Sequence, residues 1–95
     1  LQEVIHNAVH EREKEFVDFF NNATAINKRT HQVELLPGLG KKHMHEIIEK
    51  RQEKPFESFE DMRNRVSNLP NPEKAIEKRI FQELTEFERH NLFVD

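Results

Sequence analysis

The chain contains only two glycines in 95 residues, and both lie in one short segment, Leu36-Pro37-Gly38-Leu39-Gly40-Lys41-Lys42. Proline and glycine both end helices, so an apolar helical stretch that reaches Leu36 must stop at Pro37 and Gly38. Glycine also permits positive φ and lets another molecule approach the backbone closely. The segment therefore predicts a tight turn between two helices, with Leu39 pointing inward to fill the space between them.

The remainder of the chain is also patterned for helices. Glu, Lys, Arg and Leu are plentiful, Trp and Tyr are absent, and no long run alternates β-branched with polar residues, so a sheet is not expected. Apolar residues recur instead at helical spacing. They predict a helix ending near Phe20, a helix from a cap at Thr24 or Asn27 to Leu36, a helix from Leu39–Gly40 to about Arg51 or Glu53, a short helix after Ser58, and a last helix from Pro72 to about Glu88.

Two helix starts in the second half of the chain are specified by their caps. Ser58, with Asp61 three residues later, forms a capping box. Asn71 followed by Pro72 suits the cap and the first position of the last helix. We expect the inward face of that last helix to carry Ile76, Ile80, Leu84 and Phe87, with Phe81 beside them.

The turn between the glycines has the features of an anion-binding site. The amides around Leu39–Lys42 lie at the start of a helix, where the helix dipole is positive and the first donors have no partner. Phosphate is a common occupant of such a place, and contact with it positions a nucleic acid without reading its sequence. A purely structural turn with solvated side chains is the alternative. The candidate nucleic-acid-binding residues are Pro37, Gly38, Leu39, Gly40, Lys41, Lys42 and His43, extended by Lys28 and Arg29.

The string from Leu35 to Ile48 resembles the helix-hairpin-helix motif of DNA-repair and DNA-uptake proteins. Arg51 and the segment Lys54–Met62 are similar to the residues that follow the hairpin in those proteins. One departure is Met44, because many such hairpins carry alanine there, where the two helices touch. The resemblance implies binding of a phosphate backbone, with a monovalent cation between hairpin carbonyls and phosphate as a helper.

A larger part of the chain resembles the C-terminal part of an uncharacterised archaeal family of proposed RNA-binding proteins, through Asn21-Asn22-Ala23, His31–Gly38, Pro55–Asp61 and Lys78-Arg79-Ile80. This resemblance implies a further N-terminal domain, a small β-barrel of oligonucleotide-binding type, as a partner within the same protein. A first residue that is Leu1 and not methionine fits the same expectation, that the sequence is a piece of a longer chain.

A second turn echoes the first at Leu69-Pro70-Asn71-Pro72-Glu73-Lys74. Both glycines are missing there. Pro72 has no amide hydrogen to offer a phosphate, and Glu73 would repel one. We interpret this segment as a degenerate second hairpin that keeps the architecture of the first without its chemistry.

These patterns together predict an all-α fold, a five-helix bundle built on one intact helix-hairpin-helix and a degenerate second one. A single helical domain is expected over residues 1–95. Its parts are an N-terminal helix at 1–22, the helix-hairpin-helix with the following short helix at 25–66, the degenerate second hairpin helix at 71–90, and a tail at 91–95.

Composition and charge argue against several function classes. The absence of cysteine rules out disulfides and thiolate metal sites, and it favours a cytoplasmic location. No apolar run approaches membrane-spanning length, so no membrane partner is expected. Serine occurs only at Ser58 and Ser67, and the carboxylates fall on predicted helix exteriors, so we expect no enzyme, no small-molecule substrate and no cofactor. His6 and His10 share a helical face with metal-ligand spacing, but no third ligand is evident, and we interpret them as surface histidines.

Two hypotheses of function follow. The first is a non-enzymatic module that binds RNA or DNA without sequence preference through the hairpin amides and adjacent lysines. The net charge of −3 weighs against strong binding, although residues 28–65 form a segment with more basic than acidic groups. The second is a protein-interaction module that docks a partner domain or forms a homodimer, favoured by the acidic balance and by the apolar tail Leu92–Val94.

Overall fold

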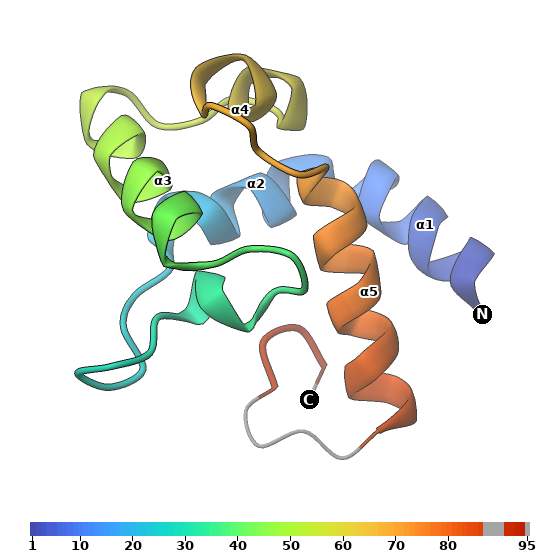
Figure 1. The fold of residues 1–95 in the computed structure, drawn as a ribbon. Helices are drawn as coiled ribbons and strands as arrows, with labels where there is room; N and C mark the ends of the chain where they lie inside the picture. The colour runs from blue at the N-terminus through green and yellow to red at the C-terminus, as the bar shows by residue number, and fades with distance from the viewer. Residues whose placement is uncertain (87–90, 95) are drawn as a thin grey trace.

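The computed structural model describes residues 1–86 and 91–94, and in this part of the chain the regular structure is helical (Figure 1). A single antiparallel bridge between Ala25 and His31 is the only extended pairing among these residues. The expected all-α fold with five helices is confirmed. The elements are α1 (Gln2–Glu11), α2 (Glu13–Asn22), a 3-10 helix η1 (Gln32–Leu35), α3 (Lys41–Glu53), α4 (Phe59–Arg65) and α5 (Pro72–Thr85).

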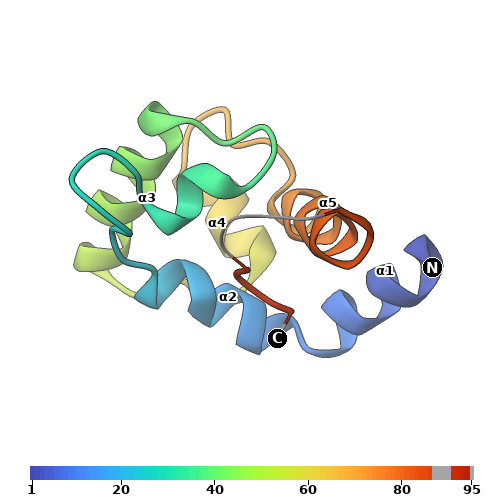
Figure 2. The same cartoon turned by 90° about the horizontal axis from the view of Figure 1, so that it is seen from below.

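The expected single N-terminal helix is in fact two helices that meet at Arg12. The backbone of Arg12 leaves the helical conformation, with φ −115° and ψ 35°. Figure 2 shows the consequence, because α1 turns away from the line of α2 and lies along α5. The break lets α1 contact α5 while α2 contacts α3, and both helices bury apolar residues, among them Val9 and Phe20.

The prediction of a helix from Thr24 or Asn27 to Leu36 is wrong for most of this segment. Asn27 does not cap a helix; its Oδ1 accepts hydrogen bonds from the amides of Arg29 at 2.8 Å and Thr30 at 2.9 Å. Such a side-chain bond to the local backbone competes with helix formation and closes a turn instead. Only the short η1 remains of the predicted helix.

His31 starts η1 and is a residue whose structural role the sequence did not reveal. Its Nδ1 accepts a hydrogen bond from the amide of Val33 at 3.1 Å, and the residue is buried. Burial, and next the nearby charge of Arg51, lower the pKa of His31, so the folded protein favours the neutral ring. The cap needs that form, since a doubly protonated ring has no acceptor.

This arrangement predicts a pH-dependent stability. Because the pKa of His31 is lower in the folded state, its stabilising contribution is complete above the ordinary histidine pKa of about 6.5 and is lost as pH falls below that value. Between pH 7.5 and 5.5 the native chain should lose up to about 1 kcal/mol more stability than His31→Asn, which keeps an acceptor that does not titrate. Urea unfolding followed by circular dichroism tests this, and equal losses in both proteins would contradict it.

The predicted starts of the later helices are confirmed. Ser58 Oγ accepts from the amide of Asp61 at 2.9 Å at the start of α4, and Asn71 Oδ1 accepts from Lys74 at 3.3 Å at the start of α5. Pro72 is the first residue of α5.

The predicted apolar face of α5 is only partly confirmed. Ile76 is fully buried and Ile80 packs against the core, but Leu84 is 49% exposed. The inward place one turn from Ile80 is taken by Glu83, whose side chain pairs with Arg79. α5 ends at Thr85 with Glu86 in an extended conformation, so it is shorter than the expected helix to about Glu88. Phe87 lies outside the described residues.

The core lies between α2, η1, α3, α4 and α5, and α1 packs against it. Its largest fully buried apolar side chains are Phe20, Phe59, Leu36, Ile47, Met62 and Ile76. Leu92 and Phe93 of the tail pack against the same core, with the Phe93 ring centroid 4.9 Å from that of Phe19 and 5.5 Å from that of Phe16.

Candidate nucleic-acid interface

Two buried leucines anchor the turn between η1 and α3 to the core. Leu36 and Leu39 are both buried, and the amide of Leu39 donates to the carbonyl of Leu36 at 3.2 Å. Leu39 therefore fills the core as the sequence predicted. Gly38 and Gly40, which alternate with the buried residues, are exposed at the surface.

The two glycines differ in backbone conformation, and only Gly38 needs to be glycine for its φ. Gly38 has φ +84°, a conformation that costs other residues about 1 kcal/mol or more. Gly40 has φ −113°, which any residue adopts. A Cβ added at either position would lie more than 4 Å from every atom outside the neighbouring residues, so the outer surface of the turn is open.

The start of α3 carries backbone donors that the described part of the chain does not use. Gly40 is the N-cap and offers no side chain, and the first amide that bonds back is that of Met44, which donates to the Gly40 carbonyl at 3.0 Å. The amides of Lys41, Lys42 and His43 precede it and receive no acceptor from residues 1–86 or 91–94. They lie where the positive end of the helix dipole favours an anion.

The structure brings the predicted basic residues of two segments together. Lys41 Nζ donates to the carbonyl of Arg29 at 2.9 Å, so the turn that carries Lys28 and Arg29 adjoins the start of α3. The same ammonium group lies 3.3 Å from a carboxylate oxygen of Glu34, which offsets part of its charge. Lys42 is exposed and has no ion pair within the described residues.

Two other basic residues of the middle segment are committed to structure, which the sequence did not reveal. Arg51 donates to the carbonyls of Phe20 and Ala23, both at 2.9 Å, and so closes the C-terminal end of α2. Arg65 donates to the carbonyls of Lys50 and Lys54, both at 2.7 Å, at the end of α3. The accessible positive charge at the turn therefore reduces to the cations of Lys28, Arg29 and Lys42, with a share from Lys41.

His43 faces the second turn and not the open side of the first. Its Nε2 lies 3.3 Å from the carbonyl oxygen of Asn68, and its Nδ1 is buried without a partner in the described chain. Asn68 has φ +55°, so the second turn also contains a left-handed residue. His43 thus links the two turns.

The second turn differs from the first in how its backbone donors are used. Asn71 caps α5, and the carboxylate of Glu46 on α3 accepts from the amide of Ser67 at 2.6 Å. Pro72 is buried and has no amide hydrogen, while Glu73 pairs with Arg63. The start of α5 therefore offers fewer free amides to an anion than the start of α3.

No helix within the described residues is both long enough and apolar enough to cross a membrane.

Comparison with known proteins gives relatives over the whole length of the chain. Residues 1–95 match the family described as "Protein of unknown function (DUF655)". An uncharacterised protein of Methanocaldococcus jannaschii is 42% identical over 91 residues, which are 96% of this chain and 41% of that protein. A crystal structure from the same family, that of Af1531 from Archaeoglobus fulgidus, is 46% identical with a TM-score of 0.88, and the match covers 100% of this chain and 53% of that one. The chain spans about half, or less, of the length of these relatives.

Proposed function

The chain belongs to the DUF655 family, and from the geometry of its first turn we propose that it is a non-enzymatic module that holds the phosphate backbone of RNA or DNA without reading sequence. The observation that carries the proposal is the open turn at the start of α3. Three consecutive amides at the N-terminus of α3 are free, and exposed lysines lie beside them. Because Gly38 and Gly40 have no side chains, nothing from these two residues blocks access to the amides. In this proposal the turn and α3 act as a helix-hairpin-helix with a shortened first helix.

The second turn supports the proposal by contrast. It has the same place relative to α5 that the first has relative to α3, but Asn71 accepts from the amide of Lys74 there and Pro72 has no amide hydrogen. A turn that only joined helices would be expected to satisfy its donors in this way. The first turn does not, and its three free amides are available to an external acceptor.

Phosphate binding is attributed mainly to amides and side chains. The carbonyl oxygens of Leu36 and Gly40 each accept one hydrogen bond, from Leu39 and Met44, and each keeps a second lone pair, so the monovalent cation implied by the helix-hairpin-helix resemblance stays in the proposal as a helper. With few accessible cations and a net charge of −3, we expect the isolated chain to bind weakly and to depend on the rest of its protein for affinity.

A fluorescence-anisotropy titration of short labelled RNA and DNA, single-stranded and duplex, tests the proposal at 50 and 200 mM salt. Two or three neutralised phosphates should give a roughly 10- to 50-fold loss of affinity between these concentrations, and two unrelated sequences should bind alike. Lys42→Gln should weaken binding and make the salt slope shallower by about 1. Lys14→Gln, an equal charge change at an exposed position of α2, should leave the affinity and the salt slope unchanged. Absence of binding at 50 mM salt, or equal effects of the two substitutions, would contradict it.

The alternative, a protein-interaction module, loses its main sequence argument. The apolar tail does not stand free, since Leu92 and Phe93 pack on the core of their own chain. Deletion of residues 91–95 with measurement of mass in solution still tests that alternative, and a loss of association would favour it.

A further inference from the structure

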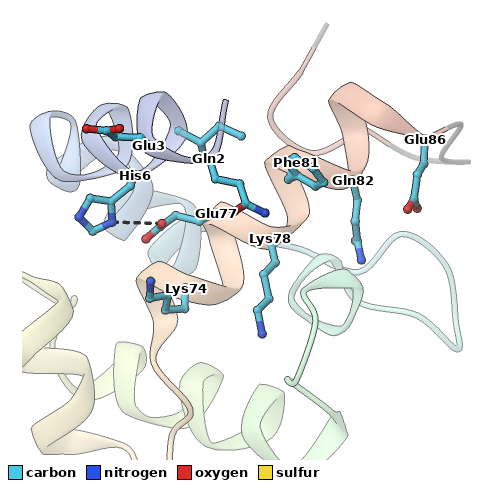
Figure 3. Close-up of a pocket in the computed structure, with 10 residues that line it drawn as sticks. Gln2, Glu3, His6, Lys74, Glu77, Lys78, Phe81, Gln82 and Glu86 are labelled. Atoms are coloured by element: carbon cyan, nitrogen blue, oxygen red, sulfur yellow. Dashed lines mark hydrogen bonds and ion pairs between the residues drawn. The ribbon is translucent and has the colours of Figure 1, made fainter.

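Three possible metal ligands from two helices converge on one point, and none of them belongs to the first turn. His6 and His10 lie one turn apart on α1, and Glu77 lies on α5. One ligand atom from each lies within 4.8 Å of the others, and no other group of three or more His, Cys, Asp or Glu in the described chain meets this condition. His6 Nδ1 and Glu77 Oε1 are 3.1 Å apart, as Figure 3 shows for these two residues, and the ring centroids of His6 and His10 are 4.3 Å apart.

We propose that His6, His10 and Glu77 bind a zinc ion that joins α1 to α5. Imidazole nitrogens and a carboxylate oxygen are ligands that zinc prefers, and the spacing of two histidines four residues apart on a helix is one that zinc sites use. Ligand atoms about 2.0–2.2 Å from a tetrahedral zinc lie about 3.3 Å from each other. The His6–Glu77 distance already matches this value, and the exposed ring of His10 has only to rotate toward them.

The state of Glu77 is a second observation in favour of a cation. Its side chain is only 12% exposed, and Oε2 is buried with no hydrogen-bond partner in the described part of the chain. A buried carboxylate oxygen without a donor is costly, and neither Lys74 nor Lys78, its neighbours on α5, forms an ion pair with it. A metal ion that both carboxylate oxygens contact would satisfy Oε2, which a simple pair between His6 and Oε1 does not.

The surroundings leave room for the rest of a coordination shell. His6 is 45% exposed and, with Glu77, borders a hollow of about 510 Å³ between α1 and α5. Water in this hollow can supply the fourth ligand. Glu3, one turn before His6, adds negative charge at the rim, while Lys74 and Lys78 on the same rim add positive charge.

The expected role of the ion is structural. Because α1 leaves the line of α2 at Arg12, its position depends on its contacts with α5, and a metal held by residues of both helices would fix it there. Binding to the folded state alone raises stability in proportion to the logarithm of the metal concentration.

The test is thermal unfolding, by circular dichroism, of protein stripped with a chelator that is then removed. Zinc at a hundredfold excess over its dissociation constant should raise Tm by on the order of 10 °C, and magnesium should not. Cobalt(II) should give the visible absorption of a tetrahedral site. No zinc-dependent rise in Tm would overturn the proposal.

Variants separate the site from general binding of zinc to histidine. His10→Gln removes an exposed ligand with no hydrogen bond to lose, so it should keep the metal-free Tm and abolish the zinc shift. Glu77→Gln should greatly reduce the shift, because the neutral amide is a poor ligand. His45→Gln, an exposed histidine of α3, should respond to zinc like the native chain. A full zinc shift in His10→Gln, or its loss in His45→Gln, would overturn the site, and neither outcome bears on nucleic-acid binding at the turn.

Discussion

Replacing Glu83 with alanine should lower the free energy of unfolding by about 3–5 kcal/mol, the loss expected when one member of a buried ion pair is removed. The Glu83 side chain has no exposed surface, and its Oε2 accepts from Arg79 Nε at 2.8 Å. Its two oxygens also accept the amides of Leu92 at 2.7 Å, Val94 at 2.9 Å and Phe93 at 3.0 Å. The substitution would leave the buried guanidinium of Arg79 without this carboxylate and would release the tail.

Urea unfolding followed by far-UV circular dichroism measures this loss, since the chain has no Trp or Tyr for fluorescence. Glu83→Gln keeps an oxygen acceptor and should lose less than Glu83→Ala. Glu86→Ala, an exposed carboxylate just beyond α5, is the matched control and should stay within about 0.5 kcal/mol of the native chain. A loss below 1 kcal/mol in Glu83→Ala would contradict the role assigned to this residue.

The same carboxylate should make stability fall in acid. Burial opposes its ionisation, but the hydrogen bonds from the tail amides and Arg79 together outweigh burial and lower the pKa of Glu83. A lowered folded pKa means that the stabilisation is complete above the ordinary glutamate pKa of about 4.3 and is lost as pH falls below it. Glu83→Gln should therefore lose less stability in acid than the native chain.

Local signals in the sequence were sufficient to predict the fold where one side chain and a nearby amide determine the structure. The caps at Ser58 and Asn71 are of this kind, and α4 and α5 begin where they predict. The start of α3 after Gly40 and the inward place of Leu39 were also predictable, because proline and glycine limit the backbone there.

Features that depend on distant partners were not predictable in this way. The break at Arg12 is needed only because α1 packs on α5 and α2 on α3. The helical pattern of residues 25–36 is genuine, but Asn27 closes a turn there and His31 starts η1 instead. Periodicity alone could not reveal this competition.

The candidate sites show the same division. The donors of the first turn follow from a local motif, whereas the commitment of Arg51 and Arg65 to helix ends became visible only in three dimensions. The sequence near His6 and His10 shows no evident third ligand, because Glu77 is 71 residues from His6. A site whose residues are brought together only by tertiary packing cannot be recognised from local patterns in one sequence.

Introducing a negative charge at Gly40 should weaken nucleic-acid binding about tenfold or more without weakening the fold. A carboxylate in Gly40→Glu would lie beside the amides of Lys41 and Lys42 and would repel a phosphate that approaches them. The position accepts a side chain, because its φ is −113° and no atom lies within 4 Å of the added Cβ. A negative charge near a helix N-terminus is itself favourable, so Tm should not fall.

Two further substitutions separate charge from obstruction and strain. Gly40→Gln has nearly the size of the glutamate variant without its charge, and Gly40→Ala adds only a methyl group, so binding should decrease in the order native, Ala, Gln, Glu. Gly38→Ala, in contrast, should cost about 1 kcal/mol of stability, because φ +84° is unfavourable for alanine. The anisotropy titration at 50 mM salt gives the affinities, and circular dichroism gives Tm. Equal affinity of Gly40→Glu and Gly40→Gln would show that the turn does not meet a phosphate, since charge at the start of α3 would then be irrelevant to binding.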